Sequence, residues 1–199
     1  MGFIDLFPTV IFHKILEDIT SNDFKQYENQ ILEDNYIPSY SGHTSTNQQF
    51  LLNPLFNNLT TQILYNSKLY LNEVGHDYKD IQITSSWANI LNKNEYINPH
   101  AHSNSYLSGV FYIEDSSDIY FENNTIMKSS FTPDFVKAKK HEYRKKTSFK
   151  ITPKKGSLII FPSWLIHSVP SNNLDKRLSI AFNIIPKGEF GSITTKMYI

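Results

Sequence analysis

The segment from Arg177 to Ile184 restricts the fold more than any other part of this chain. Every second residue is apolar, and the residues between them are mostly polar: Leu178, Ile180, Phe182 and Ile184 alternate with Arg177, Ser179, Ala181 and Asn183. A period of two predicts a β-strand with one face in a core. An arginine, a serine and an asparagine cannot share a dry core without partners. Their face of the strand therefore either meets water or lines a polar cavity.

Short strands with turn residues between them are predicted before and after this segment. We expect them at residues 81–89, 107–113, 118–122, 157–161, 165–169 and 177–185, after an early strand at 9–14, with a further strand that starts at Tyr96 and leads into a loop carrying the histidines. Such a series is typical of a β-sandwich or jelly roll. Because residues 170–175 have the composition of a hairpin loop, the strands that carry His167 and Arg177 are expected to be antiparallel neighbours.

Two helices are predicted in the N-terminal half, where they would back the sheet. The first is capped by Ser21 or Asn22 and has apolar residues at helical spacing. The second covers residues 54–74, starts at Asn53-Pro54 and stops at Gly75. Residues 36–50 resemble a loop. Residues 123–150 hold a basic run and are interpreted as an insertion, either a solvated one or a lid over a site.

Composition excludes several classes of function. The 199 residues contain no cysteine, so any metal must be held by nitrogen and oxygen ligands. A formal net charge of zero removes the usual electrostatic argument for nucleic-acid binding. No apolar run approaches the roughly 20 residues of a membrane helix, and the first residues do not resemble a signal peptide. We expect one domain over residues 1–199, in a soluble, cytoplasmic protein that does not bind membranes. The sequence does not indicate an oligomeric state.

Two histidines precede the apolar strand at 107–113. In an extended segment His100 and His102 point to the same side, so both can face one cavity. The pair alone is weak evidence, because two nearby histidines are common. With His167 it predicts a metal site with open positions, which suits Fe(II). The guanidinium of Arg177, with the hydroxyl of Ser179 beside it, matches a carboxylate. The alternative is an exposed strand face.

Taken together, these motifs resemble a family of 2-oxoglutarate- and Fe(II)-dependent oxygenases found in marine bacteria and their phages. The resemblance is carried by Trp87–Asn89, His100–Tyr112, Gly156–Pro170 and Arg177–Asn183, with Leu6–Pro8 and Ser41–Thr46 in addition. It covers nearly the whole chain. It implies a mainly β (α+β) fold, a double-stranded β-helix with two backing helices, and a hydroxylase that uses Fe(II), 2-oxoglutarate and O2, with ascorbate in support. A phage-encoded copy would act in the host cytoplasm.

The resemblance also assigns site residues. His100 and His167 match the two histidine ligands, and Arg177 and Ser179 match the clamp for the far carboxylate of 2-oxoglutarate. His102 stands where most oxygenases of this kind have Asp or Glu, so it either binds the metal as a third histidine or lies behind a bound water. Asn89, Ser108 and Tyr112 are expected to contribute to the wall that binds the cosubstrate; ordinary strand packing is as good an interpretation of Tyr112.

Two other functions remain open at this point. A cupin-like metalloprotein that does not use a 2-oxo acid would explain the three histidines, but not an inward-facing Arg177. An inactive virion or accessory protein would keep the jelly roll and bind metal weakly. The substrate is equally open, and a peptidyl residue, a free amino acid, a nucleobase or a small metabolite all fit.

Overall fold

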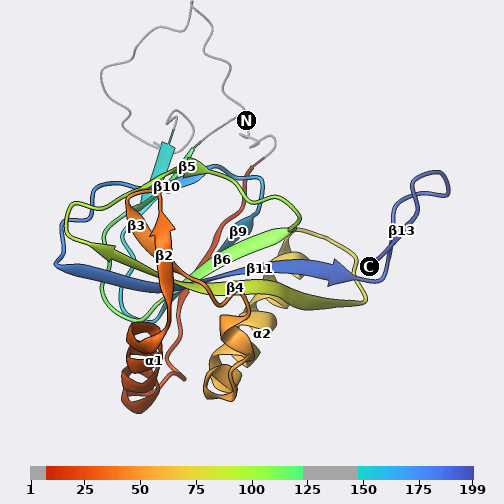
Figure 1. Cartoon of the computed structure of the whole chain (residues 1–199). Helices are drawn as coiled ribbons and strands as arrows, with labels where there is room; N and C mark the ends of the chain where they lie inside the picture. The colour runs from red at the N-terminus through yellow and green to blue at the C-terminus, as the bar shows by residue number, and fades with distance from the viewer. Residues whose placement is uncertain (1–7, 123–147) are drawn as a thin grey trace, which may run out of the picture.

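The computed structural model describes residues 8–122 and 148–199. Within these residues, most strands belong to two sheets that face each other. The larger sheet has the order β1-β9-β6-β11-β4-β3-β2 and the smaller has the order β5-β10-β7-β8. All the pairings in these two sheets are antiparallel. This arrangement is the predicted double-stranded β-helix with helical backing (Figure 1).

The strands of the larger sheet are β1 (Phe12–Ile15), β2 (Tyr36–Ser39), β3 (Gly42–Ser45), β4 (Asp80–Asn92), β6 (Leu107–Tyr112), β9 (Ser157–Pro162) and β11 (Lys176–Lys187). Those of the smaller sheet are β5 (Ile97–His100), β7 (Ile119–Glu122), β8 (Ser148–Ile151) and β10 (His167–Val169). A separate hairpin near the C-terminus consists of β12 (Glu189–Phe190) and β13 (Met197–Tyr198) and projects from the body of the molecule (Figure 1).

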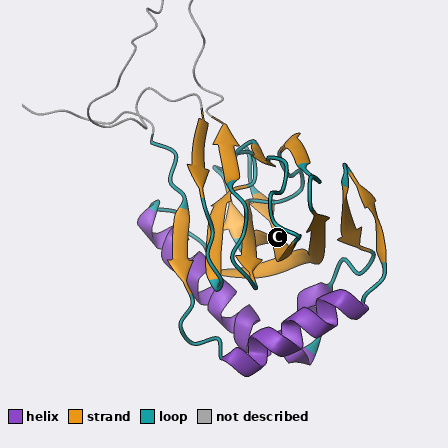
Figure 2. Ribbon diagram, turned by 90° about the vertical axis from the view of Figure 1, so that its left-hand side faces the viewer, coloured by secondary structure: helices purple, strands orange, loops and turns teal. Residues whose placement is uncertain are grey.

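The helices cover the face of the larger sheet that points away from the smaller sheet (Figure 2). Helix α1 (Ser21–Glu33) is capped by Thr20 in a capping box with Asp23, one residue before the predicted cap. Asn53 caps a 3-10 turn, η2 (Pro54–Phe56), which leads into α2 (Asn57–Glu73). A shorter turn, η1 (Phe50–Leu52), precedes it. Gly75, at φ 73°, ends this helical region as predicted.

The main core lies between these helices and the larger sheet. The apolar face of β11 is completely buried there, with Ile180, Phe182 and Ile184 all at 0% exposure. A second, smaller core, around Phe121 and Phe161, lies between the two sheets. The alternation of apolar and polar residues along β11 therefore separates a face buried in this core from the opposite, mostly polar face, which is described below.

Two expectations about the strands are wrong. Residues 36–50 are not a loop throughout, because β2 and β3 form a hairpin that adds to β4 at the edge of the larger sheet. His167 and Arg177 do not lie on neighbouring strands, because β10 belongs to the smaller sheet and β11 to the larger one. Residues 170–175 cross between the sheets. Asn172 holds this crossing with bonds from its side-chain amide to the carbonyl oxygens of Leu91 and Leu174.

The predicted insertion at 123–150 lies outside the described residues, except for residues 148–150, which belong to β8. In the described part of the chain, no helix is long and apolar enough to span a membrane.

Candidate active site

A cavity of about 420 Å³ lies between the two sheets, and the polar face of β11 forms part of its floor. Strand register places the floor residues in rows across the larger sheet. The first row is Thr44, Asn89, Ser179 and Tyr112, on β3, β4, β11 and β6. The next is Trp87, Ala181 and Val110, and the third is Ser85 and Asn183. Of the two sequence alternatives for this face, an exposed strand or a polar cavity, the structure shows the cavity.

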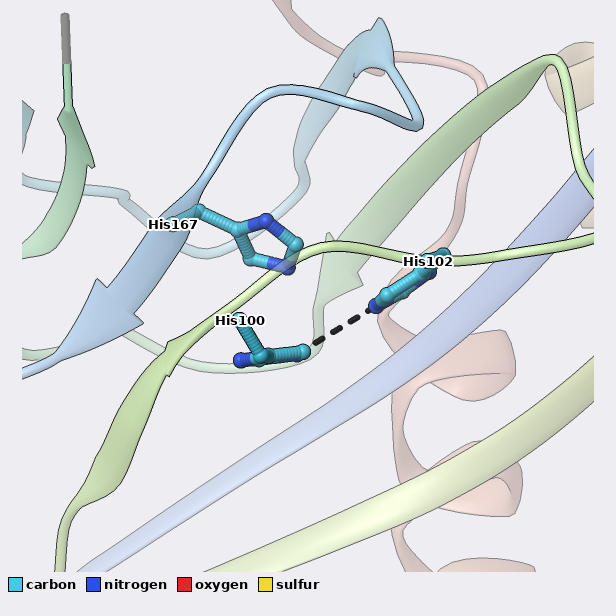
Figure 3. A group of neighbouring side chains, drawn as sticks. All are labelled: His100, His102 and His167. Carbon is cyan, nitrogen blue, oxygen red and sulfur yellow. Dashed lines mark hydrogen bonds between the residues drawn. The ribbon is translucent and has the colours of Figure 1, made fainter. Parts of the chain in front are cut away.

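Three histidines meet at one side of this cavity (Figure 3). His100 ends β5 and is directly opposite His167 on β10, so that the centres of their rings are 4.3 Å apart. His102 comes from the loop after β5, and its Nε2 lies 3.3 Å from Nε2 of His100. One ligand atom from each ring lies within 4.8 Å of the others. The cluster thus joins two strands of the smaller sheet to a loop.

Each of the three rings is oriented by an acceptor at its Nδ1 atom. His100 Nδ1 lies 2.8 Å from the carbonyl oxygen of Asn98, and His167 Nδ1 lies 2.9 Å from that of Leu165. His102 Nδ1 lies 2.7 Å from Oδ1 of Asn183. A carbonyl or amide oxygen only accepts, so Nδ1 carries the proton in each ring. The lone pairs on the three Nε2 atoms are left free for a metal ion.

The loop that carries His102 is fixed against the larger sheet, at β11 and at the turn that follows β9. The backbone N–H of His102 donates to the carbonyl oxygen of Ser163, and the N–H of Tyr106 donates to that of Ile184 at the end of the polar stretch of β11. Ser108 Oγ lies 2.8 Å from His102 Nδ1 and donates to Asn183 Oδ1, also at 2.8 Å. These bonds give the ring of His102 one position although it lies outside the strands.

Burial keeps two of the histidines neutral. It is the main reason why the pKa of His167 is lowered to about 3, and the nearby His100 acts in the same direction. Burial also lowers the pKa of His102, against the hydrogen bond to Asn183, which raises it. A neutral imidazole is the form that binds a metal. These rings therefore need not lose a proton at neutral pH before they can act as ligands.

Arg177 lies on the floor of the same cavity and is only 2% exposed. Its guanidinium donates to three hydroxyl oxygens, those of Ser116 at 2.8 Å, Tyr112 at 3.1 Å and Ser179 at 3.3 Å. Among the residues that the structure describes, no carboxylate lies within ion-pair distance of it. A buried cation without a counter-ion is costly. The arrangement therefore favours an anionic ligand in the cavity.

Most of the residues singled out from the sequence line this cavity: His100, His102, His167, Arg177, Ser179, Asn89 and Tyr112. Ser108 does not line it and lies behind His102. Sequence reasoning missed Ser116, the partner of Arg177, because a serine in a turn gives no signal. It placed Asn183 on the polar face of its strand but gave it no role. It also missed Tyr40, Thr44 and Gln48, because residues 36–50, which carry them, were taken for a loop.

Comparison with known proteins identifies a family model described as "Putative 2OG-Fe(II) oxygenase", which matches residues 85–183. This segment runs from β4 to the end of the polar stretch of β11. It contains the three histidines and Arg177.

Solved structures of similar fold include HygX from Streptomyces hygroscopicus, crystallised with nickel and 2-oxoglutarate. It is 11% identical, with a TM-score of 0.62, over 89% of this chain and 83% of that one. A prolyl-4-hydroxylase from Pseudomonas putida is 10% identical, with a TM-score of 0.60, over 90% of this chain and 94% of that one. The epimerase SnoN from nogalamycin biosynthesis is 12% identical, with a TM-score of 0.64, over 92% and 82%. At these identities the likeness shows the fold alone. No curated protein matches the chain.

Proposed function

The chain is an oxygenase of the 2OG-Fe(II) family, and from that premise we propose how its own residues divide the work of a hydroxylase. The observation that carries the proposal is that one cavity holds both the histidine cluster and the buried guanidinium of Arg177. The two groups come from opposite sheets and face the same space. One suits a metal ion and the other suits a carboxylate.

The donor set fits iron. His100, His102 and His167 would hold it through their Nε2 atoms, since each Nδ1 is already engaged. The 3.3 Å between the Nε2 atoms of His100 and His102 agrees with two nitrogens that each lie about 2.1 Å from one metal ion. This supports a direct role for His102. A third neutral ligand in place of a carboxylate would leave the metal more positive.

Arg177 would bind the far carboxylate of 2-oxoglutarate, with Ser179 and Tyr112 beside it. The hydroxyls of these two residues already hold the guanidinium, so the fork is oriented before the acid arrives. Burial raises the pKa of Tyr112, while Arg177 opposes that rise. Its phenol therefore stays protonated and can serve as a hydrogen-bond donor. Asn89, next to Ser179 across the strands, is proposed to complete this wall.

With 2-oxoglutarate and O2 bound, the iron would supply the oxidising chemistry that converts a C–H bond of the substrate into C–OH. The protein would hold the metal and orient the acid. Phe161, whose ring centre is 4.6 Å from that of His167, and Ile119 would exclude water from that side of the cluster. The cytoplasmic location stays a prediction.

The test is 2-oxoglutarate binding and turnover by iron-loaded protein. We expect slow, uncoupled formation of succinate without substrate, and calorimetric binding of 2-oxoglutarate to the metal-loaded protein. Arg177→Met should weaken that binding roughly 10- to 100-fold, because a charge-assisted hydrogen-bonded pair is lost. Metal affinity should be retained. Lys176→Met, which removes the exposed cation next to it on β11, is the matched control.

A cupin-like protein that does not use a 2-oxo acid would bind the metal and ignore 2-oxoglutarate. Wild-type protein that holds iron, but neither binds nor consumes 2-oxoglutarate, would therefore refute the proposal.

A further inference from the structure

The cavity continues beyond the histidines and Arg177 toward the edge of the larger sheet. We call this side the hairpin flank. It consists of Ser39, Tyr40, Thr44, Gln48, Ser85 and Trp87. These residues come from the β2–β3 hairpin, the segment that follows it and β4. None of them is needed to hold the metal or the acid in the function proposed above.

Two aromatic rings of the hairpin flank stand beside the histidines. The ring centre of Trp87 is 5.6 Å from that of His102, and the ring centre of Tyr40 is 5.6 Å from that of His100. Tyr40 lies in the turn between β2 and β3 at φ 55°, a backbone region that is uncommon for a residue with a side chain. It is 53% exposed and lines the cavity. The two rings offer apolar faces on the approach to the cluster.

The polar groups of the hairpin flank are uncharged. The hydroxyl of Thr44 has no hydrogen-bond partner among the described residues, and it lies beside Asn89 across the strands. The side-chain amide nitrogen of Gln48 donates to the carbonyl oxygen of Ser45, which leaves the amide oxygen of Gln48 free to accept. A ligand here would meet hydrogen-bonding groups that work with hydroxyls and amides.

Charge is confined to the other side of the cavity. Among the described residues, no aspartate, glutamate or lysine lines it, and Arg177 is its only permanently charged lining side chain. In the proposed function Arg177 is already paired with the cosubstrate. A charged group on the hairpin flank would lose hydration there and would meet no charged side chain of the flank, which is costly.

We propose that the hairpin flank binds the primary substrate, and that the part bound there is an uncharged group that carries hydroxyls or amides and stacks on Trp87. The inference rests on the proposed function, since it assumes that the histidines and Arg177 are occupied by metal and cosubstrate. A sugar ring and an amide side chain share this chemistry, so the test has one arm for each.

The experiment uses Trp87 as its own reporter. The chain has two tryptophans, and Trp164, which is 55% exposed, does not line the cavity. In a Trp164→Phe protein loaded with zinc and 2-oxoglutarate, tryptophan fluorescence then reports on Trp87 alone. The sugar arm compares N-acetylglucosamine with glucosamine and glucuronate. The amide arm compares N-acetylasparagine amide with the corresponding aspartate and diaminobutyrate derivatives.

We expect a neutral member of one arm to bind at least about tenfold more tightly than its charged counterparts, because the hairpin flank offers no charged side chain to pair with them. The arm that binds identifies the source of the chemistry. By calorimetry, Trp87→Ala should weaken binding of that probe about five- to tenfold, and Trp87→Phe should restore most of it. Tyr65→Ala, which truncates an exposed aromatic residue on α2 outside the cavity, is the matched control.

Binding of 2-oxoglutarate separates this inference from the proposed function. If the acid does not bind to wild-type protein, the proposed function fails first. If it binds, the inference is overturned by any of three results. These are tighter binding of a charged probe, no binding of any neutral probe, or neutral binding that Trp87→Ala leaves unchanged.

Discussion

At the scale of single residues, the cluster depends on how each imidazole is protonated. The folded, metal-free protein keeps His167 neutral down to a pKa of about 3, whereas an unfolded histidine takes up a proton near pH 6.5. Between these values the unfolded state binds more protons, so the free energy of unfolding must rise with pH and fall on acidification.

We expect His167 to contribute a slope of up to about 1.4 kcal/mol per pH unit in that window. The measurement is urea unfolding of chelator-treated protein between pH 3 and 7. His167→Gln removes the titrating group and should flatten the curve. Equal slopes for the variant and the wild type would show that His167 is not held neutral by burial.

The amide of Asn183 is expected to set the metal affinity through His102. Asn183→Leu removes the acceptor at His102 Nδ1, so Mn(II) or Zn(II) affinity should fall about tenfold. Asn183→Asp keeps an oxygen there and should bind metal at least as well as the wild type. A competition titration with a chromophoric chelator measures both. A Leu variant with wild-type affinity would mean that Ser108 orients the ring sufficiently by itself.

Much of this site could be predicted from residue types and their spacing. The rest depends on contacts between segments that are distant in sequence. His100 and His102 follow from a two-residue spacing in an extended segment, and Arg177 from the polar face of its strand. Asn183 lies on that same face. Its partner is His102, which only the fold of the loop after β5 brings next to β11. Ser116 binds Arg177 across 61 positions of sequence, and no local pattern reports such a contact.

At the scale of the elements, Gly109 on β6 is paired between β11 and β9, and its neighbours leave no room for a side chain there. A Cβ added there would lie 2.3 Å from the ring of Phe182 and 2.7 Å from the carbonyl oxygen of Ile159. The second atom belongs to the backbone of β9 and cannot turn away. Gly109 therefore permits the close approach of the strands that form the cavity floor.

Gly109→Ala should lower the free energy of unfolding by about 1–3 kcal/mol, the usual cost of overpacking. The comparison is Gly42→Ala, whose added Cβ would meet mainly the end of the Leu91 side chain, with the nearest backbone oxygen 3.1 Å away. Denaturant unfolding of both variants should show the larger loss for Gly109. The reverse order would contradict the conclusion that β9 and β11 leave no room for a side chain at Gly109.

The strands and helices with strong periodicity were predictable, and weakly patterned elements were not. Along β11 the apolar residues recur at every second position, and Asn53-Pro54 and Gly75 mark the helical region that contains α2. The β2–β3 hairpin has no such alternation, because its exposed Ile37 and half-buried Thr44 lie at the edge of the sheet. Pairing with β4, not a buried face of its own, stabilises it.

At the scale of the whole molecule, a bound metal would join segments that are distant in sequence. A ligand that binds only the folded state, at about 100 times its dissociation constant, adds about 2.7 kcal/mol to the free energy of unfolding. Excess Mn(II) should therefore raise the melting temperature of wild-type protein. His100→Ala should melt at the same temperature with and without Mn(II). A wild-type melting temperature indifferent to Mn(II) and Fe(II) would favour an inactive accessory protein.

The layout of the whole molecule was only partly readable from the sequence. The order of short strands predicted a jelly roll, and the structure confirms it. The assignment of β10 and β11 to one hairpin failed because a short polar loop is equally compatible with a turn within a sheet and a passage between two sheets. The strand pairing decides between them: His167 on β10 pairs with His100 in the smaller sheet, whereas Ser179 on β11 pairs with Asn89 in the larger sheet.

The passage formed by residues 170–175 makes the two halves of the site a tethered pair. Most of the histidine cluster belongs to one sheet and the guanidinium to the other, and this short connection, anchored at Asn172, joins the strand of His167 to the strand of Arg177. A single cut by a protease within it would leave every site residue intact and place Arg177 on a separate polypeptide, which only the pairing of β11 with β4 and β6 would then hold in the site.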